Sequence, residues 1–390
     1  MNRQMKYRSL FMFLVFVAVG ALVISCAPKA AKPVGEMDTP EHHFYTGVKL
    51  LDQGKYAAAQ MEFDRSIQLA PKFSKAYAGN GLVKAYQGDS KGAFEVMKQA
   101  WKYAKQDDET VFVHVCKIRL YTMGKPDKDW LNDALSELEA AIKIDPKSAA
   151  AYYFAGLAQK SALNFEKAGQ MFKQVIDINK DYVAVADVEW NLTQKIQRAM
   201  PGTVAGKKIA IVERITRADA AALFMEELKI DVLYKKRTPK TFDTAFKDPE
   251  KAKTASSAAP ATAADIAGHP LKVDIEGILA IGVRGLEAYP DGTFRPNEFV
   301  DRATYAMMIE DILIKVTGDN ALATKFIGSV SPFPDLRADL PYFNAVMVVT
   351  SRGIMQAKDL TTGEFAPLNP VPGVDALLII RKIKEELKFF

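Results

Sequence analysis

Two arginines stand near the starts of expected helices, in the stretches "ERITRADAAALF" and "AYPDGTFRPNEFVDRATYAMM". Thr216 and Asp301 can cap these helices, which places Arg217 and Arg302 in the first helical turn. A cation at that position opposes the helix dipole and is normally disfavoured. Beside free backbone N–H groups, however, a planar guanidinium helps to form a site for a carboxylate or a similar anion. The chemistry that these arginines favour is therefore anion binding.

Both stretches also have an interpretation that needs no ligand. Asp219 can return a hydrogen bond to the cap residue Thr216, which completes a capping box. Pro290, Asp291 and Gly292 are the residues that a tight turn requires, because glycine accepts a positive φ and aspartate bonds to its own turn backbone. These structural roles account for most of the motif, but they leave the arginines unexplained.

The C-terminal half resembles the S-layer homology motif, in which a helix and a turn of the form "DGTFRP" precede a second helix that begins near "ITRAE". One copy runs from Asp265 to Met308, half of another lies at Ile215–Asp219, and a third runs from Phe333 to Ile383, so the match covers about residues 205–388. The resemblance implies a three-fold pseudo-symmetric helical bundle whose grooves bind acidic cell-wall glycans. The glycan-binding residues that it implies are Arg217, Asp219, Asp291, Gly292, Arg295 and Arg302.

The chain departs from this family pattern at several positions. Residues 269–271 read "HPL" where the family usually has "HWA", so the tryptophan that could stack on a sugar is missing. In the third copy Gly373 replaces the arginine, and Ala366 stands where Arg295 stands in the second. We therefore expect the third groove to be structural only.

The N-terminus has the order of a secretory signal. Three cations precede an apolar run from Leu10 to Ile24, which is shorter than the roughly twenty residues of a membrane span. The run ends at "VISCAPK", which resembles a bacterial lipobox with Cys26 as the lipidated residue. The resemblance implies a signal peptide over residues 1–25 and acyl chains such as palmitate on a flexible tether over 26–40. Ala27 then implies the outer membrane, and an ordinary signal or anchor helix is the alternative.

Residues 41–182 contain about four copies of a repeat. Ala59 and Ala93 are one step of 34 residues apart, Ala134 follows after 34 plus a seven-residue insertion, and Ala168 follows after another 34. This period resembles the tetratricopeptide repeat, which implies pairs of antiparallel helices and a concave face for extended protein partners. The residues that we expect on this face are His42, Tyr45, Lys49, Lys75, Arg119, Tyr153 and Lys160.

The predicted fold class is mainly α, with an N-terminal tetratricopeptide α-solenoid followed by a three-motif S-layer homology bundle with little β structure. Residues 183–204 form the connecting helix or linker. Residues 247–264 are rich in Ala, Ser, Thr, Lys and Pro, which indicates a flexible insertion in the C-terminal domain.

Composition argues against several function classes. A net charge of +5 over 390 residues is too small to indicate a nucleic-acid partner. The four histidines have no metal-ligand spacing, and no Ser, His and Asp set is evident, so we expect no enzyme, metal or cofactor. Cys116, within "VFVHVCKIRLY", fits a small core residue better than a nucleophile.

These observations favour a non-enzymatic, lipid-anchored adaptor at the periplasmic face of the outer membrane. Its repeats would hold a protein partner while its C-terminal domain binds peptidoglycan or an associated acidic glycan. The alternative is a pure assembly scaffold of secretion or outer-membrane machinery without glycan binding. A weaker third possibility is a subunit that stimulates a wall synthase or hydrolase.

Overall fold

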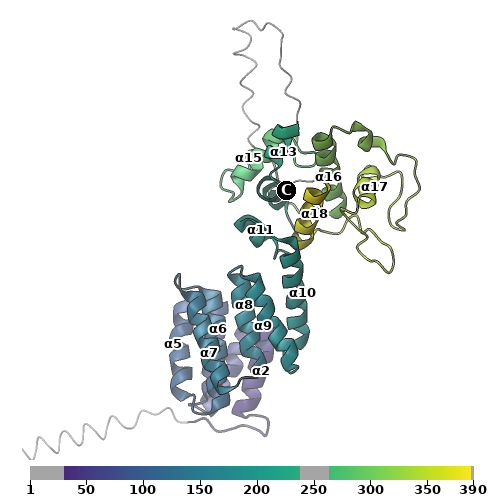
Figure 1. Ribbon diagram of the computed structural model, residues 1–390. Helices are drawn as coiled ribbons and strands as arrows, with labels where there is room; N and C mark the ends of the chain where they lie inside the picture. Colours follow the sequence, from purple (N-terminus) through teal and green to yellow (C-terminus); the bar gives the residue numbers. More distant parts are fainter. Residues whose placement is uncertain (1–29, 238–262, 388–390) are drawn as a thin grey trace, which may run out of the picture. The chain divides into compact units, whose positions relative to one another are not determined.

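The computed structural model describes residues 30–237 and 263–387, which are mainly helical (Figure 1). They divide between Asp187 and Val188 into two compact units, unit 1 before this point and unit 2 after it. No helix in the described ranges is long and apolar enough to cross a membrane. The mainly α class is confirmed. The predicted signal, Cys26 and nearly all of the insertion at 247–264 lie outside the described residues.

Unit 1 is a row of helices in which each helix packs against the next, as the solenoid prediction requires. The tetratricopeptide assignment itself stays a prediction. The pairs are α2 (Pro40–Asp52) with α3 (Tyr56–Leu69), α4 (Ser74–Tyr86) with α5 (Ser90–Tyr103), α6 (Asp107–Gly124) with α7 (Trp130–Ile144), and α8 (Ala149–Ser161) with α9 (Phe165–Ile178), followed by α10 (Val183–Ala199).

Glycines let the two helices of a pair approach closely around a phenylalanine. A Cβ added to Gly47 would lie 2.6 Å from Cε1 of Phe63, and one added to Gly156 would lie 2.6 Å from Cε1 of Phe172. Both phenylalanine rings are fully buried. Any larger residue at these glycines would therefore displace a ring from a close-packed core.

Unit 2 is built from shorter helices joined by long turns. Its elements after α10 are α11 (Val204–Ile209), α12 (Arg217–Ala222) with a π-helical turn (Leu223–Glu227), α13 (Ile230–Arg237), α15 (Lys272–Ile281), α16 (Arg302–Thr317), a short 3-10 helix (Asn320–Thr324), α17 (Phe343–Ser351) and α18 (Gly373–Glu386). The helices α12, α16 and α18 begin at equivalent places in the three predicted copies of the motif.

A closed ring of backbone hydrogen bonds joins these three helix starts. The N–H of Ile215 donates to the carbonyl of Val371 over 2.9 Å, that of Val300 to Ile215 over 3.0 Å, and that of Val371 to Val300 over 3.2 Å. Each copy thus donates to one neighbour and accepts from the other, as three-fold pseudo-symmetry requires. Only isolated bridges accompany this ring in the described residues, so the expectation of little β structure is confirmed.

Candidate functional site

Arg217 is buried at the first position of α12, with 6% of its surface exposed. Its guanidinium donates three hydrogen bonds to backbone carbonyls, from Nε to Phe294 (2.8 Å), from Nη1 to Gly285 (2.6 Å) and from Nη2 to Glu287 (2.8 Å). The side chain therefore holds the long turn of the second copy against the helix start of the first.

Arg302 repeats this arrangement one copy further on, at the first position of α16 and with 5% of its surface exposed. Its Nε donates to the carbonyl of Phe365 (2.8 Å) and its Nη2 to that of Gln356 (2.6 Å). Unlike its counterpart in Arg217, Nη1 of Arg302 has no hydrogen-bond partner within the described residues. Burial lowers the pKa of this guanidinium. The two arginines thus occupy equivalent positions, but Arg217 makes one more hydrogen bond through its guanidinium than Arg302 does.

The expectation of free N–H groups beside these arginines is wrong. The backbone N–H of Arg217 donates to Glu298 O and that of Ala218 to Pro296 O. In α16 the N–H of Arg302 donates to Asn369 O and that of Ala303 to Pro367 O. The neighbouring turn lays its carbonyls over each helix start, so these helix ends do not offer open amides to an anion.

The predicted capping residues take the places that the sequence assigns them. The Oγ1 of Thr216 accepts from the N–H of Asp219, and Asp219 Oδ2 accepts from the N–H of Thr216 over 2.9 Å, so the capping box is present. Asp301 accepts from the N–H of Thr304 over 2.7 Å. Asp219 is thereby occupied within its own helix start.

The turn of the second copy gathers Tyr289, Asp291, Gly292 and Arg295. Gly292 has φ +77°, as a tight turn requires. Hydrogen bonds from Thr293 and Arg295 lower the pKa of Asp291 to about 2. Arg295 is half exposed and lies 4.0 Å from the centre of the Tyr289 ring, whereas Arg217 lies 4.8 Å from it. Arginines therefore already contact the aromatic ring nearest to this turn.

Two aspartates that the sequence interpretation missed fasten the turns. Asp265 accepts from the N–H groups of Phe294 (2.8 Å) and Arg295 (2.8 Å). Asp335 accepts in the same way from Phe365 (2.9 Å) and Ala366 (2.7 Å). An alignment of the second copy against the third places both aspartates at the same distance, within one residue, before the turn. That internal comparison is the signal that could have found them.

Close packing explains why the third copy has Gly373 where the other two have an arginine. A Cβ added to Gly373 would lie 1.7 Å from the carbonyl oxygen of Ile209, at the end of α11. The N–H of Gly373 donates to Val212 O over 3.0 Å. The end of α11 therefore fills the space next to the start of α18, and no arginine fits there.

A basic cleft of about 600 Å³ lies beside Arg302. Its walls come from α10, from the turn after α17 and from α18. We call this cleft the basic cleft. Six cations and two carboxylates line it: Lys195, Arg198, Arg302, Lys358, Arg381 and Lys382, and Asp375 and Glu385. Lys195 and Arg198 lie before the first copy of the motif, whereas Lys358, Arg381 and Lys382 lie within the third copy but away from its turn and helix start. The motif therefore did not point to these five cations.

The carboxylates balance only part of this charge. Glu385 pairs with Arg381 (3.2 Å) and Lys382 (2.9 Å), and Asp375 lies 3.6 Å from Lys358. Neither Lys195 nor Arg198 has an ion-pair partner among the residues that the structure describes, and both are exposed. The cleft thus has an excess of positive charge, with two exposed cations at its edge.

Part of unit 2 matches a known protein family. Residues 286–306 match the S-layer homology domain. The match spans the turn of the second copy and the start of α16, including Arg295 and Arg302. S-layer homology domains bind cell-wall polymers, so the match indicates association with the cell wall or envelope. A comparison of the chain with curated proteins gave no match.

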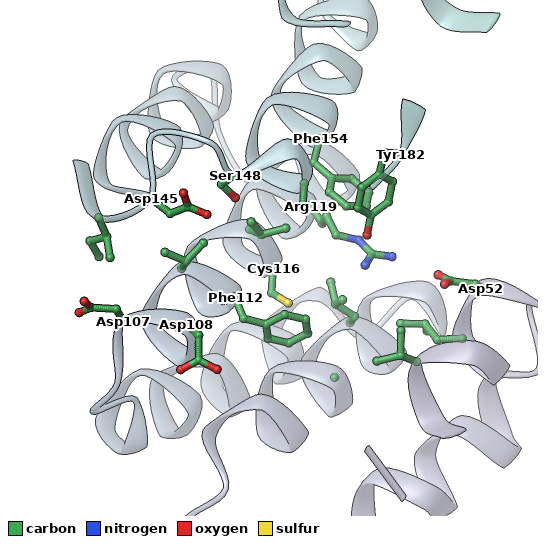
Figure 2. Close-up of a pocket in the computed structure, with 18 of the residues that line it drawn as sticks. Asp52, Asp107, Asp108, Phe112, Cys116, Arg119, Asp145, Ser148, Phe154 and Tyr182 are labelled. Atoms are coloured by element: carbon green, nitrogen blue, oxygen red, sulfur yellow. The ribbon is translucent and has the colours of Figure 1, made fainter. Parts of the chain in front are cut away.

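The seven residues predicted for the concave face of unit 1 differ in whether they reach its pocket. Arg119 lines a pocket of about 420 Å³, and Lys75 pairs with Asp108, which lines the same pocket (Figure 2). Tyr153 stacks on Tyr182, with ring centres 5.0 Å apart. His42, Tyr45, Lys49 and Lys160 do not line this pocket.

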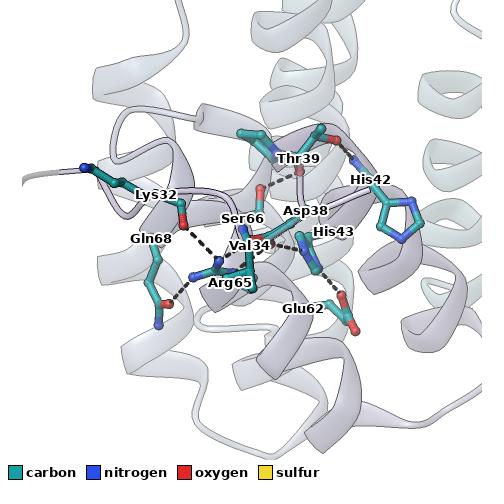
Figure 3. Close-up of polar contacts among 11 residues, drawn as sticks. Lys32, Val34, Asp38, Thr39, His42, His43, Glu62, Arg65, Ser66 and Gln68 are labelled. Carbon is teal, nitrogen blue, oxygen red and sulfur yellow. Dashed lines mark hydrogen bonds and ion pairs between the residues drawn. The ribbon is translucent and has the colours of Figure 1, made fainter. Parts of the chain in front are cut away.

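The adjacent His43 is a structural residue. Its Nε2 contacts Asp38 (2.8 Å) and its Nδ1 contacts Glu62 (2.6 Å), as Figure 3 shows. Arg65 also bonds to Asp38, from Nε over 2.9 Å. This network fastens the segment before α2 to α3.

Cys116 and the remaining histidines give no sign of a reactive centre. Burial raises the pKa of Cys116 to about 12, which leaves the thiol protonated at neutral pH. No cluster of three or more His, Cys, Asp or Glu side chains in the described ranges could hold a metal ion.

Proposed function

We propose that the protein is a non-enzymatic envelope adaptor whose unit 2 binds an anionic cell-wall polymer in the basic cleft. The cleft lies in the same unit as the S-layer homology match, and it presents six cations against two carboxylates. That excess of positive charge is the observation that carries the proposal, because the negative charges of an acidic glycan lose hydration on binding and need cations nearby to compensate. Arg302 contributes through its buried charge and its unpaired Nη1.

The adaptor proposal has two further parts. Unit 1, with the repeat pattern of tetratricopeptide proteins, would hold a protein partner. Acyl chains on Cys26 would anchor the other end to a membrane, which the lipobox resemblance supports. Together these parts would link a membrane, a protein and the wall at the periplasmic face of an outer membrane.

Removing the unpaired cations tests the wall-binding part. The full chain, held in lipid nanodiscs, is sedimented with isolated cell-wall sacculi. We expect Lys195→Gln with Arg198→Gln to weaken retention by about threefold to tenfold, because each exposed ionic contact contributes up to about 1 kcal/mol. The matched control is Lys207→Gln with Lys208→Gln, which removes the same charge from α11 of the same unit, outside the cleft. Equal loss in both pairs would count against a site in the cleft.

The alternative is a pure assembly scaffold. It is favoured by the bonding of Arg217 and Arg302 to backbone carbonyls, since these contacts give both arginines a structural role. In that case the wild-type chain would not sediment with sacculi even at low salt, and partners would still co-purify with it.

A further inference from the structure

The pocket in unit 1 has an unusual arginine. Nε of Arg119 is buried and has no hydrogen-bond partner among the residues that the structure describes. Its Nη2 donates to the hydroxyl of Tyr86 over 3.2 Å, and its guanidinium lies 4.5 Å from the centre of the Phe154 ring. A buried donor without an acceptor is rare in folded proteins, and here it belongs to a charged group. The arginine therefore offers a donor and a positive charge to an acceptor from outside.

The rest of the pocket has a defined order along α6. Asp108, Phe112, Cys116 and Arg119 follow one another at steps of four, four and three residues, so they share one face of the helix. This face runs from an acidic end through an apolar middle to the arginine. Figure 2 shows Asp107, Asp108 and Asp145 on one side of the pocket and Arg119 on the other.

Charges at the acidic end differ in their availability. Asp108 already pairs with Lys75. Asp107 is exposed and has no ion pair within the described part of the chain, and Asp145 accepts only a turn hydrogen bond from Lys147. Asp52 also lines the pocket, but no hydrogen bond or ion pair joins it to Arg119. The free carboxylates at this end are therefore Asp107 and Asp145.

Helix geometry sets the length of a ligand that would use both ends. At 1.5 Å per residue, the Cα atoms of Asp108 and Arg119 are about 17 Å apart. An extended peptide rises about 3.3 Å per residue, so about five residue steps cover that distance. The lining residues come mainly from α2, α4, α6 and α8, one helix of each pair, with Phe63 of α3, Ile144 of α7 and Tyr182 besides, so the pocket reaches all four helix pairs. A peptide segment suits such a site better than a compact solute.

We propose that this pocket binds an extended peptide segment with an acidic residue at Arg119, apolar side chains over Phe112 and Cys116, and a basic residue toward Asp107 and Asp145. The inference rests on the proposed protein-binding role of unit 1 and names the chemistry of its partner. The carboxylate supplies the acceptor that Arg119 lacks, and the basic residue balances the two free aspartates.

The test uses the full chain in lipid nanodiscs and a fluorescent peptide with blocked ends that carries a glutamate, four apolar residues and a lysine. Anisotropy should show saturable binding. We expect Arg119→Gln to weaken it at least tenfold and Arg119→Lys to weaken it less. A peptide with glutamine in place of glutamate should bind the wild type as weakly as the original peptide binds Arg119→Gln, and combining both changes should add little further loss.

A second variant tests the acidic end of the pocket without changing the buried Arg119. Asp107→Asn with Asp145→Asn should weaken the lysine peptide about threefold or more, and should not affect a peptide whose lysine is replaced by glutamine. The matched control, Glu139→Gln with Glu166→Gln, removes two exposed carboxylates from α7 and α9 and should change nothing. Equal binding by all peptides, or displacement of the peptide by a fatty acid in all variants alike, overturns the proposal.

Co-purification separates this inference from the proposed function. If partners co-purify from membranes and the peptide neither binds nor displaces them, the adaptor role stands and the pocket assignment fails. If no partner co-purifies and the peptide does not bind, the protein-binding part of the proposed function fails as well.

Discussion

At the scale of single residues, the arginines of unit 2 act first on the backbone. Arg217 supplies three donors to carbonyls of a turn that is distant in sequence, and each of those carbonyls is otherwise without a helix or sheet to satisfy it. The sequence predicted the helix-start position of this arginine correctly. It did not predict the direction of the side chain, because the carbonyl acceptors belong to a different copy of the motif.

Replacing Arg217 should therefore destabilise unit 2. We expect Arg217→Gln to lower the free energy of unfolding by about 2–4 kcal/mol, since buried carbonyls lose charged donors. Arg217→Lys should recover little, because one ammonium cannot reach three acceptors in a plane. Denaturant unfolding measures the effect. Arg295→Lys, at a half-exposed position of the same turn, is the control and should change stability by much less.

The contacts of Asp38 predict how the stability of unit 1 depends on pH. Hydrogen bonds from Arg65, from the N–H of Val34 and from His43 lower the pKa of its carboxyl. The folded pKa lies below the unfolded value of about 3.9, so the stabilisation is present above about pH 4 and is lost as the pH falls through the folded pKa. Asp38→Asn should lower the unfolding temperature at pH 7, and the difference from wild type should narrow below pH 4. A difference that is independent of pH would contradict this account.

At the scale of elements, the repeat period predicted the helix pairs of unit 1 because small residues recur where helices must touch. Gly156 lies against Phe172 as Gly47 lies against Phe63. In unit 2 the internal copies predicted where α12, α16 and α18 begin. They could not predict the basic cleft, since Lys195 lies outside the copies and Arg381 lies near the end of the third, so that only the fold brings the two together.

The close contact at Gly156 makes a direct test of this packing. Gly156→Ala should lower the free energy of unfolding by about 1–3 kcal/mol, because the added methyl group displaces a buried ring. Phe172→Leu in the same chain should restore part of the loss by making room. Gly35→Ala, where no atom lies within 4 Å of an added Cβ, is the control. Thermal unfolding followed by circular dichroism reports all three, and equal stability of the alanine variants would refute the packing argument.

At the scale of the whole molecule, each unit is proposed to bind its ligand by a chemistry of its own. Unit 1 offers an apolar pocket with opposite charges at its ends, and unit 2 offers a cleft with excess positive charge. The two sites call for different ligands, which is what an adaptor requires. The sequence predicted the helix pairs of unit 1 and the S-layer homology motif matched at residues 286–306, but the residues that line each site emerged only from the packing of distant segments.

The most direct test of the central claim is the salt dependence of wall binding. The wild-type chain in lipid nanodiscs is sedimented with sacculi at ionic strengths from about 0.01 M to 1 M, a range over which the screening length falls from about 30 Å to 3 Å. The account predicts retention at low salt that declines steadily and is lost at high salt, with an earlier loss for Lys195→Gln with Arg198→Gln. Retention that is absent at low salt, or that does not change with salt, would contradict it.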